Sequence, residues 1–316
     1  MTQINLKKMK ILICGSGSIA MRHYKNLIFL GYKDIIFYKS TEYFRKKTNL
    51  KKKNIYYNLD KALSQKPDIA FICNDTSKHV NTAIQCAKKK CHLFVEKPIS
   101  HNLINIQKLK GIINKNKIFF FVGYMLRFHP LIEKIKEIVN QKNSKIFYAS
   151  SIWGEFLPDW HPLENYKKSY AANKNLGGGV KLTLSHDLDL MYYLFGKIKK
   201  IKNLDKYNSQ LNINVDVSST YLLRFFSGVD CNLHINYLSK PPIRDLKILG
   251  ENIQIFFDYY KSTLKVIKKN RQKIYKLKNF KRNDMFLSEI KYFLNCIKIK
   301  KKSNLKNDFY LLNYLI

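Results

Sequence analysis

The stretch Ile11-Leu12-Ile13-Cys14-Gly15-Ser16-Gly17-Ser18-Ile19-Ala20 decides the fold of this chain. Four apolar residues predict a short buried strand, and the pattern Gly15-x-Gly17-x-x-Ala20 follows it directly. The first glycine permits a tight turn, the second lets a pyrophosphate approach the backbone, and the small alanine lets the next helix pack on the sheet. Free N–H groups at the start of that helix favour negative charge. The order of strand, glycine loop and helix therefore predicts a Rossmann dinucleotide-binding domain.

Short apolar runs alternate with amphipathic segments as far as residue 123. The runs are Ile11–Cys14, Ile35–Tyr38, Ile69–Cys73, Leu93–Val95 and Ile118–Val122. Ile19, His23 and Leu27 share one face of the first helix, and Gly31 lies where a C-terminal cap belongs. This alternation predicts an α/β domain over residues 1–123, with a parallel sheet covered on both faces.

From residue 124 onward, a pattern of period two dominates. Two hairpins are predicted, one around the turn Ser227-Gly228 and one around Gly250-Glu251-Asn252. A late helix is predicted from the shared face of Phe286, Ile290, Phe293 and Ile297, with Asn283 as its N-cap. We therefore expect residues 124–316 to form an α+β domain with a largely antiparallel sheet.

The chain is strongly basic, with 58 Lys and Arg against 22 Asp and Glu and a formal net charge of +36. Such an excess attracts polyanions, so a nucleic-acid binder is one reading of this sequence. The lysines are scattered through every segment, however, which favours a compositional bias and no specific nucleic-acid partner. The 6 cysteines form no C-x-x-C pair, which favours a reducing compartment and no metal site. No run approaches the roughly 18 apolar residues of a membrane span, so we expect a cytoplasmic protein.

The end of the second predicted strand bears on the choice of cofactor. It reads Tyr38-Lys39-Ser40-Thr41. An NAD-binding domain usually carries Asp or Glu here, because a carboxylate bonds the 2′-hydroxyl of the ribose. Lys39 would instead attract a 2′-phosphate, and Ser40 and Thr41 offer hydroxyls to it. We therefore expect NADP to be preferred over NAD.

From Phe94-Val95-Glu96-Lys97-Pro98 onward, the chain resembles the Gfo/Idh/MocA oxidoreductases. The Glu96-Lys97-Pro98 triplet at the end of a strand is a hallmark of that family. Further similar segments follow the family order and extend the resemblance over nearly the whole chain. They are Asn74-Asp75-Thr76-Ser77-Lys78-His79, Gly123-Tyr124-Met125-Leu126-Arg127-Phe128-His129-Pro130, Gly177-Gly178-Gly179 and Ser185-His186-Asp187-Leu188-Asp189.

The resemblance implies an enzyme that moves a hydride between a nicotinamide and a hydroxyl-bearing carbon, usually of a sugar or cyclitol. Lys97 would polarise the reacting oxygen and His186 would exchange its proton, and these two are the expected catalytic residues. The expected cofactor-binding residues are Gly15, Gly17, Ser18, Ile19, Ala20, Lys39, Ser40, Thr41, Asn74, Thr76, His79, Glu96, Lys97 and Arg127. The expected substrate-binding residues are Lys97, Arg127, Trp160, Tyr166, Thr183 and His186.

One departure from the family pattern keeps a second reading open. Many relatives carry an Asp one turn before the histidine, whereas this chain has Thr183, which does not titrate. A non-catalytic dinucleotide sensor on the same fold is therefore an alternative, although Lys97 and His186 are retained. Metal binding by His186, Asp187 and Asp189 is disfavoured, because the three do not share one helical face.

The aromatic stretch from Trp153 to Tyr170 bears on the substrate. Aromatic faces suit the C–H surface of a sugar, and Arg127, Lys167 and Lys168 suit a phosphate or carboxylate. The stretch resembles members linked to surface-polysaccharide biosynthesis, which implies an activated or acidic sugar; a purely structural loop is the alternative. The family also implies a homo-oligomer formed through the sheet of the second domain.

Overall fold

The computed structural model describes residues 6–39, 54–141, 144–207 and 210–316. The chain divides into two compact units. The first comprises Met1–Tyr124 and Phe286–Ile316, and the second comprises Met125–Met285. The expected boundary after residue 123 therefore lies within one residue of the division seen in the structure.

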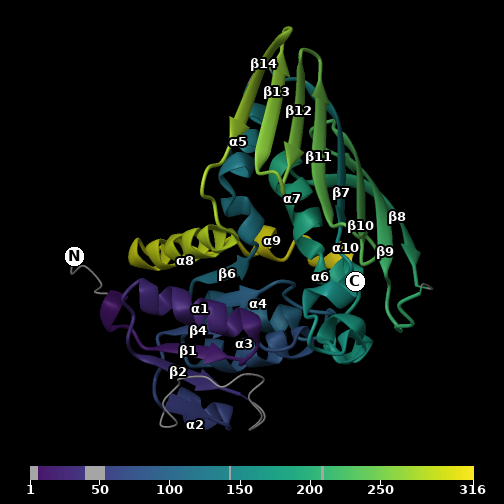
Figure 1. Cartoon of the computed structure of the whole chain (residues 1–316). Helices are drawn as coiled ribbons and strands as arrows, with labels where there is room; N and C mark the ends of the chain where they lie inside the picture. Colours follow the sequence, from purple (N-terminus) through teal and green to yellow (C-terminus); the bar gives the residue numbers. More distant parts are fainter. Residues whose placement is uncertain (1–5, 40–53, 142–143, 208–209) are drawn as a thin grey trace. The chain divides into compact units, whose positions relative to one another are not determined.

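The first unit is built on a six-stranded parallel sheet in the order β3-β2-β1-β4-β5-β6 (Figure 1). Its strands are β1 (Ile11–Cys14), β2 (Ile35–Tyr38), β3 (Ile55–Tyr56), β4 (Ile69–Ile72), β5 (His92–Glu96) and β6 (Phe120–Gly123). The order reverses at β1, which is the switch point of a doubly wound sheet. The predicted Rossmann fold is confirmed, and the short edge strand β3 is the one strand of this sheet that the apolar pattern missed.

Two hydrophobic layers cover the two faces of this sheet. On one face, α1 (Ser18–Phe29) and α8 (Arg282–Lys298) pack against β1, β4 and β5. On the other, α2 (Leu59–Leu63), α3 (His79–Lys88) and α4 (Ile106–Asn116) pack with the segment that includes α10 (Leu312–Leu315). Because both faces are covered, β1 and β4 are buried along their whole length. Short helical turns η1 (Leu6–Lys8), η3 (Thr76–Lys78) and α9 (Leu305–Asp308) complete the unit.

The C-terminal residues differ from the expected domain organisation. Residues 286–316 were expected in the second domain, but they belong to the first unit. The physical reason is the apolar face of α8, where Ile290 and Phe293 join the core with Phe71 and Phe94. The apolar face predicted for α8 is thus confirmed, whereas its expected place in the second domain is wrong. The helix also begins at Arg282, so Asn283 lies inside it and is not the N-cap.

The second unit is built on an eight-stranded sheet in the order β14-β13-β12-β11-β7-β10-β9-β8 (Figure 1). Its strands are β7 (Ile146–Gly154), β8 (Ile198–Lys206), β9 (Ser218–Phe225), β10 (Asp230–Asn236), β11 (Ile243–Gly250), β12 (Ile253–Asp258), β13 (Thr263–Lys268) and β14 (Arg271–Lys276). Only β7 and β10 pair in parallel, so the predicted, largely antiparallel sheet is confirmed. Both predicted hairpins, β9–β10 and β11–β12, are also confirmed.

Helices cover one face of the eight-stranded sheet. On β9, Tyr221, Leu223 and Phe225 are buried, whereas Leu222 between them is exposed. The helices of the unit are α5 (Pro130–Val139), α6 (Val180–Thr183) and α7 (Ser185–Phe195). Short turns are η4 (Met125–Phe128), η5 (Leu157–Trp160), η6 (Tyr166–Lys168), η7 (Tyr170–Ala172) and η8 (Lys174–Leu176). In the packed layer, the ring of Phe195 on α7 lies 5.5 Å from that of Phe225.

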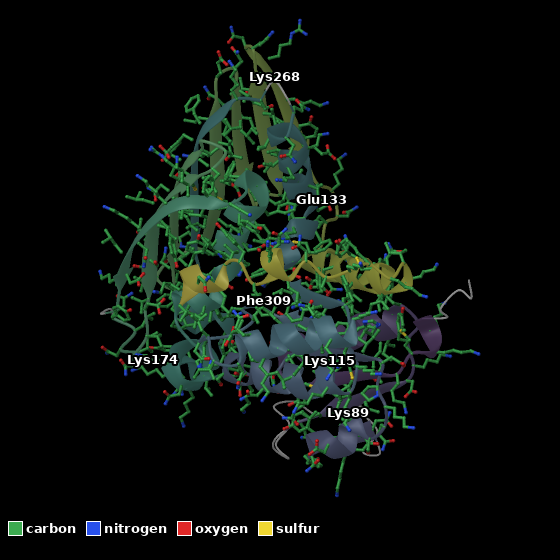
Figure 2. The ribbon with its side chains drawn as sticks, turned by 180° about the vertical axis from the view of Figure 1, so that it is seen from behind. Lys89, Lys115, Glu133, Lys174, Lys268 and Phe309 are labelled. Carbon is green, nitrogen blue, oxygen red and sulfur yellow. The ribbon has the colours of Figure 1, made fainter. Side chains whose placement is uncertain are left out.

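Part of the positive charge has a structural role at the edges of this sheet. Both edge strands, β8 and β14, are rich in exposed lysine and arginine. Charged side chains on an edge strand prevent its unpaired backbone groups from pairing with another chain. Basic side chains also extend from other parts of both units, as Lys89, Lys115, Lys174 and Lys268 illustrate (Figure 2). Among the described residues, no helix has the length and apolar character needed to cross a membrane.

Candidate active site

The glycine loop is shaped by the neighbouring strand. Gly15 has a φ of +121°, and a Cβ there would lie 2.6 Å from the carbonyl oxygen of Cys73. Its N–H donates to the carbonyl of Tyr38 at 2.8 Å. A side chain at this position would therefore strain the backbone and collide with the loop after β4. The loop is thus pinned at the carboxyl end of β1, where ligands bind in open α/β sheets.

The start of α1 presents hydrogen-bond donors that fit a pyrophosphate. The N-cap Gly17 makes no side-chain cap, and the first turn from Ser18 carries no acidic residue. Apart from the chain neighbours of Gly17, no atom of the described residues lies within 4 Å of a Cβ built there, so a ligand can approach the backbone. Ala20 is fully buried against the sheet, as predicted. Unpaired N–H groups, the helix dipole and open space together fit a bound dinucleotide phosphate.

The predicted 2′-phosphate site is described only in part. Lys39 is buried, its N–H donates to the carbonyl of Tyr56, and its Nζ lies 5.1 Å from the ring centroid of Tyr57. Ser40 and Thr41 lie outside the described residues. Lys39 therefore stands at the end of β2 as expected, with its ammonium over an aromatic ring.

The loop after β4 is tied to the segment after β5 by His79. Its Nδ1 lies 2.8 Å from the carbonyl oxygen of Pro98, and its Nε2 lies 2.8 Å from that of Asn74. Burial lowers the pKa of His79. Both ring nitrogens face backbone carbonyls, so His79 shapes the loop that also holds Thr76, which is buried. The Asn74 side chain donates to Thr82 at 2.9 Å, and its Oδ1 is buried without a hydrogen-bond partner among the described residues.

The Glu96-Lys97-Pro98 triplet lies at the carboxyl end of β5. Glu96 is buried, and its Oε1 lies 2.6 Å from Nε2 of His23. Its Oε2 accepts the backbone N–H of Lys97 at 3.3 Å. Lys97 itself is half-buried. Because β4 pairs with both β1 and β5 in parallel, Lys97 and the glycine loop share one edge of the sheet.

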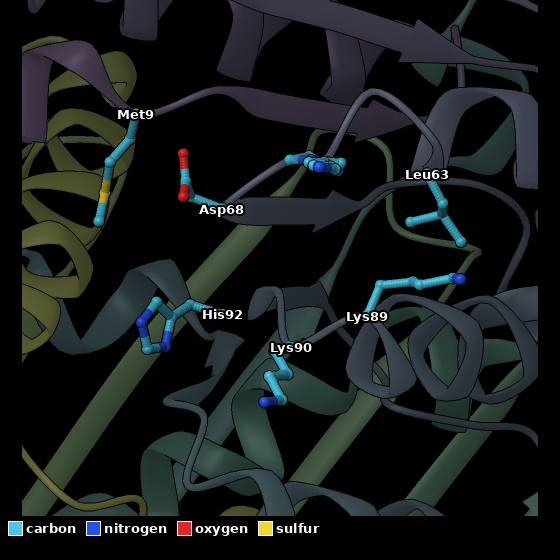
Figure 3. Close-up of a pocket in the computed structure, with 8 residues that line it drawn as sticks. Met9, Leu63, Asp68, Lys89, Lys90 and His92 are labelled. Carbon is cyan, nitrogen blue, oxygen red and sulfur yellow. The ribbon is translucent and has the colours of Figure 1, made fainter.

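A hollow at the opposite edge of the first unit is not this site. It has a volume of about 360 Å³ and lies before β4 and β5, next to Asp68 and His92 (Figure 3). Its lining is Met9, Leu63, Lys66, Pro67, Asp68, Lys89, Lys90 and His92. None of the predicted cofactor or catalytic residues is among them.

In the second unit, Arg127 pairs with Asp189 on α7. Its Nε and Nη2 donate to the two carboxylate oxygens of Asp189 at 2.8 and 2.5 Å. Asp189 is fully buried, and burial raises its pKa although Arg127 lowers it. Because such a pair is bidentate, it fixes the guanidinium and carboxylate groups relative to one another. The guanidinium expected to meet cofactor and substrate is therefore anchored on α7.

His186 lies in the first turn of α7, buried against an aromatic side chain. Its ring centroid is 3.7 Å from that of Trp153, in an edge-on arrangement. The next residue, Asp187, pairs with Arg244 at 3.3 Å. The Arg244 guanidinium stacks on Trp153, the same ring that His186 contacts. Asp187 and Asp189 both follow His186 on α7. Asp187 faces Arg244 and Asp189 faces Arg127, and both arginines belong to the same unit.

Thr183 is engaged with protein groups. Its Oγ1 donates to the carbonyl of Gly179 at 2.7 Å and contacts the hydroxyl of Tyr237. Tyr237 is fully buried, which raises its pKa, and its ring lies 5.4 Å from that of Trp160. Two predicted substrate residues, Thr183 and Trp160, are thus brought together around Tyr237. Another predicted substrate residue, Tyr166, donates its hydroxyl hydrogen to the carbonyl of Leu211 at 3.1 Å.

Sequence reasoning missed several residues of this unit. Tyr237, Arg244 and Asp216 were not singled out as site residues. Asp216 Oδ2 accepts the N–H of Lys181, and its Oδ1 would be 2.2 Å from a Cβ on Gly179. Gly179 has a φ of +104°, so the Gly177-Gly178-Gly179 run was the available signal. The partner residues lie too far along the chain for any local pattern to reveal them.

Comparison with known proteins identifies the class to which this fold and site belong. Residues 9–124 match the family described as "Oxidoreductase family, NAD-binding Rossmann fold", and residues 132–256 match its "GFO/IDH/MocA C-terminal domain". The chain therefore belongs to the Gfo/Idh/MocA oxidoreductases, as its motifs implied.

Individual relatives agree with this assignment. The chain is 25% identical over 313 residues to myo-inositol 2-dehydrogenase of Thermotoga maritima, covering 92% of this chain and 88% of that protein. Levoglucosan dehydrogenase, solved with NADH and levoglucosan, matches with a TM-score of 0.82 at 14% identity over 98% of this chain and 96% of that one. UDP-N-acetylglucosamine 3-dehydrogenase of Acidithiobacillus ferrooxidans matches with a TM-score of 0.78 at 16% identity over 97% and 95%. The two structural likenesses show the fold, and the family makes this chain an NAD(P)-dependent oxidoreductase acting on CH–OH groups.

Proposed function

We propose that this protein transfers a hydride between NADP and a hydroxyl-bearing carbon of an acidic or nucleotide-activated sugar, in surface-glycan biosynthesis. A bound nicotinamide supplies the hydride chemistry. Lys97 hydrogen-bonds the reacting oxygen and stabilises the charge that develops on it. His186 takes the hydroxyl proton when the carbon is oxidised and returns it in the reverse direction.

The observation that carries the proposal is the position of Lys97. It follows β5 directly, at the same sheet edge as the loop from Gly15 to Ala20. Ligands of doubly wound sheets bind at this edge. Glu96 and Pro98 hold the backbone on either side of Lys97, through the contacts to His23 and His79. A lysine held in this way is suited to meet the substrate's reacting oxygen beside a bound nicotinamide.

NADP preference rests on Lys39. Among the described residues, the one that follows β2 is Lys39 and not a carboxylate, which would repel a 2′-phosphate. The proposal predicts tighter binding of NADPH than of NADH in a fluorescence titration, and a loss of that preference in Lys39→Ala. Equal affinities in the wild type, or tighter NADH binding, would contradict it.

The substrate class rests on the cationic and amide side chains of the second unit. A hollow of about 360 Å³ there is lined by Lys167, Lys174 and several asparagines, which suit hydroxyls and a negative group; its lining includes Lys167 but none of the expected catalytic residues. Trp160 beside Tyr237 adds aromatic surface for sugar C–H groups. We also propose that the exposed side of β9, with Leu222, contributes to a homo-oligomer, which sedimentation tests. Six buried free thiols favour a cytoplasmic location.

The test of the function is a thermal-shift and turnover screen. NAD and NADP are offered alone and then with free sugars, sugar acids and nucleotide sugars. We expect a further rise in melting temperature with one sugar class, and absorbance change of the nicotinamide with the same class. If the cofactor raises the melting temperature and no sugar adds to that rise, the result would favour a dinucleotide sensor. Thr183 is compatible with a sensor, because its hydroxyl does not titrate as the Asp of many relatives does.

The active substrate then allows the residues to be tested. Lys97→Ala and His186→Ala are each expected to lower turnover by about 10²–10⁴-fold, the usual contribution of such groups. His234→Ala is the matched control for His186 and leaves turnover unchanged, because His234 lies on β10 with its Nδ1 2.8 Å from Oγ1 of Thr220 on β9. Near-normal turnover in either of the first two variants would remove that residue from the mechanism.

A further inference from the structure

Three titratable side chains from three separate elements meet inside the first unit. They are His23 on α1, Glu96 at the end of β5 and Glu289 on α8, all buried. One nitrogen or carboxylate oxygen from each lies within 4.8 Å of the others. Only Glu96 belongs to the segment that the proposed reaction uses. The cluster therefore joins α8 to β5, the strand that directly precedes Lys97.

The surroundings of the cluster are apolar. The His23 ring lies 5.4 Å from Phe71, 5.0 Å from Phe94 and 6.2 Å from Phe286, measured between ring centroids. Glu289 is 0% exposed. Both of its carboxylate oxygens, and Nδ1 of His23, meet no hydrogen-bond partner among the described residues. The carboxyl group of Glu289 has thus lost water without gaining a donor from the protein.

The charges of the cluster do not balance if both carboxyl groups are ionised. An imidazolium at His23 would compensate one carboxylate, and Glu96 holds that contact at 2.6 Å. A second ionised carboxylate in apolar surroundings is costly, and such a group takes up a proton instead. Burial, and next the charge of Glu96, raise the pKa of Glu289 well above its ordinary value.

A proton fits this geometry better than a metal ion does. Two ligands at about 2.0–2.1 Å from a tetrahedral Zn²⁺ are separated by roughly 3.3 Å. His23 Nε2 and Glu96 Oε1 are 2.6 Å apart, which is a direct hydrogen bond. The pair is therefore closed on itself and does not bracket an ion.

We propose that Glu289 is a protonated carboxylic acid in the folded protein, so that no second negative charge disturbs the contact by which His23 holds the carboxylate of Glu96. Because Glu96 also accepts the backbone N–H of Lys97, Glu289 is a positioning residue for the lysine. This last step rests on the proposed function, whereas the protonation of Glu289 does not. The C-terminal helix thereby contributes to the site that the Rossmann strands form.

Other titratable or charged groups lie near the cluster. Cys73, after β4, is buried, and burial raises the pKa of its thiol well above the usual value. Burial lowers the pKa of His79 on α3, and its contacts to the carbonyls of Pro98 and Asn74 act in the opposite direction. On α1, the Arg22 guanidinium stacks on the ring of Phe286, 4.7 Å from its centroid.

The pH dependence has a definite sign. The folded pKa of Glu289 lies above the unfolded one, so the folded state holds the extra proton between them. Stability from this group is present at low pH and falls as the pH rises from about 4.5 toward the folded pKa. Glu289→Gln keeps the shape and a donor but cannot lose a proton. The stability of this variant relative to wild type must therefore increase as the pH rises.

The test compares Glu289→Gln with Glu137→Gln in the full chain. Glu137 is exposed on α5 and serves as the matched control. Infrared difference spectra at pH 7 should show a carboxylic-acid carbonyl band in wild type and in Glu137→Gln that Glu289→Gln lacks. Melting curves between pH 5 and 8 should show the rising relative stability of Glu289→Gln alone. A missing acid band, or parallel pH profiles, would overturn the protonation of Glu289.

Positioning is read from Lys97 directly. Acetylation of Lys97 by acetic anhydride, followed by mass spectrometry with Lys61 as an internal reference, needs no substrate. We expect Glu289→Ala to change the pH profile of Lys97 acetylation several-fold and Glu289→Gln to restore it. An unchanged profile in a folded Glu289→Ala protein would reject positioning. If the wild type binds one equivalent of Zn²⁺ and Glu289→Gln does not, the cluster is a metal site and the protonation of Glu289 is rejected.

Discussion

The glycine loop of the first unit is shaped by backbone contacts, whereas helix α7 of the second unit is held by side-chain ion pairs. Gly15 lies against the backbone of Cys73, and no side chain can be added there. Asp189 and Asp187 on α7 are held by Arg127 and Arg244, from η4 and β11. The shape of the glycine loop therefore depends on the absence of a side chain at Gly15. The position of α7 depends on arginines that lie far from it in the sequence.

The largest effect should come from breaking the buried pair of the second unit. Arg127→Ala leaves the Asp189 carboxyl group buried without its guanidinium, which typically costs about 3–5 kcal/mol. Arg224→Ala is the control, because Arg224 binds Asp230 with the same fork geometry at the surface. Urea unfolding of both variants checks this. A loss for Arg224→Ala as large as for Arg127→Ala would contradict the role of burial.

Acid should weaken the second unit through His129. Burial, and then Arg244, lower the pKa of His129 from 6.5 to about 4. The unfolded state therefore binds the proton first, and stability falls as the pH drops from about 6.5 to 4, by on the order of 3 kcal/mol (2.5 pH units at 1.36 kcal/mol each).

His129→Asn tests that expectation. Asn retains an N-cap acceptor for the N–H of Leu131 and removes the titration. Melting curves at pH 7 and pH 4.5 should lie closer together for this variant than for wild type. The exposed His161→Asn should keep the wild-type difference. An unchanged difference in His129→Asn would assign the acid sensitivity to another group.

Gly15→Ala should destabilise the first unit by about 1–3 kcal/mol from its backbone strain alone, with the contact to Cys73 added. Gly111→Ala is the control, since Gly111 lies in α4 with open space around its Cα. Alanine there should stabilise by about 0.5–1 kcal/mol. Thermal unfolding gives both values. A Gly15→Ala protein as stable as wild type would show that the loop can rearrange.

Gly17→Ala should have the smallest effect on stability, within about 0.5 kcal/mol, because the added methyl meets no atom of the described residues beyond its chain neighbours. Binding of NADPH should nevertheless weaken, since that open space is where a pyrophosphate approaches. Fluorescence titration measures the affinity and thermal unfolding the stability. Unchanged affinity would place the phosphates elsewhere.

The sequence predicted most of the first unit because its strands are continuous apolar runs ended by glycine or polar loops. The hairpins of the second unit were predictable for a similar reason, since burial alternates along β9 and β10. The two-residue strand β3 was not, because two residues carry no period. The partner of α8 was also hidden, because an apolar stripe shows that a helix packs but not against which sheet.

The sequence by itself determined the dinucleotide loop, the family and the candidate residues Lys97 and His186, because these depend on residue types at short, fixed spacings. Only the tertiary structure decided which charges meet. It anchored Arg127 on Asp189, joined Thr183 to Tyr237 and enclosed Glu289 with His23 and Glu96. The reason is physical: local spacing sets strands and turns, whereas the energy of a buried charge depends on partners that only folding brings within reach.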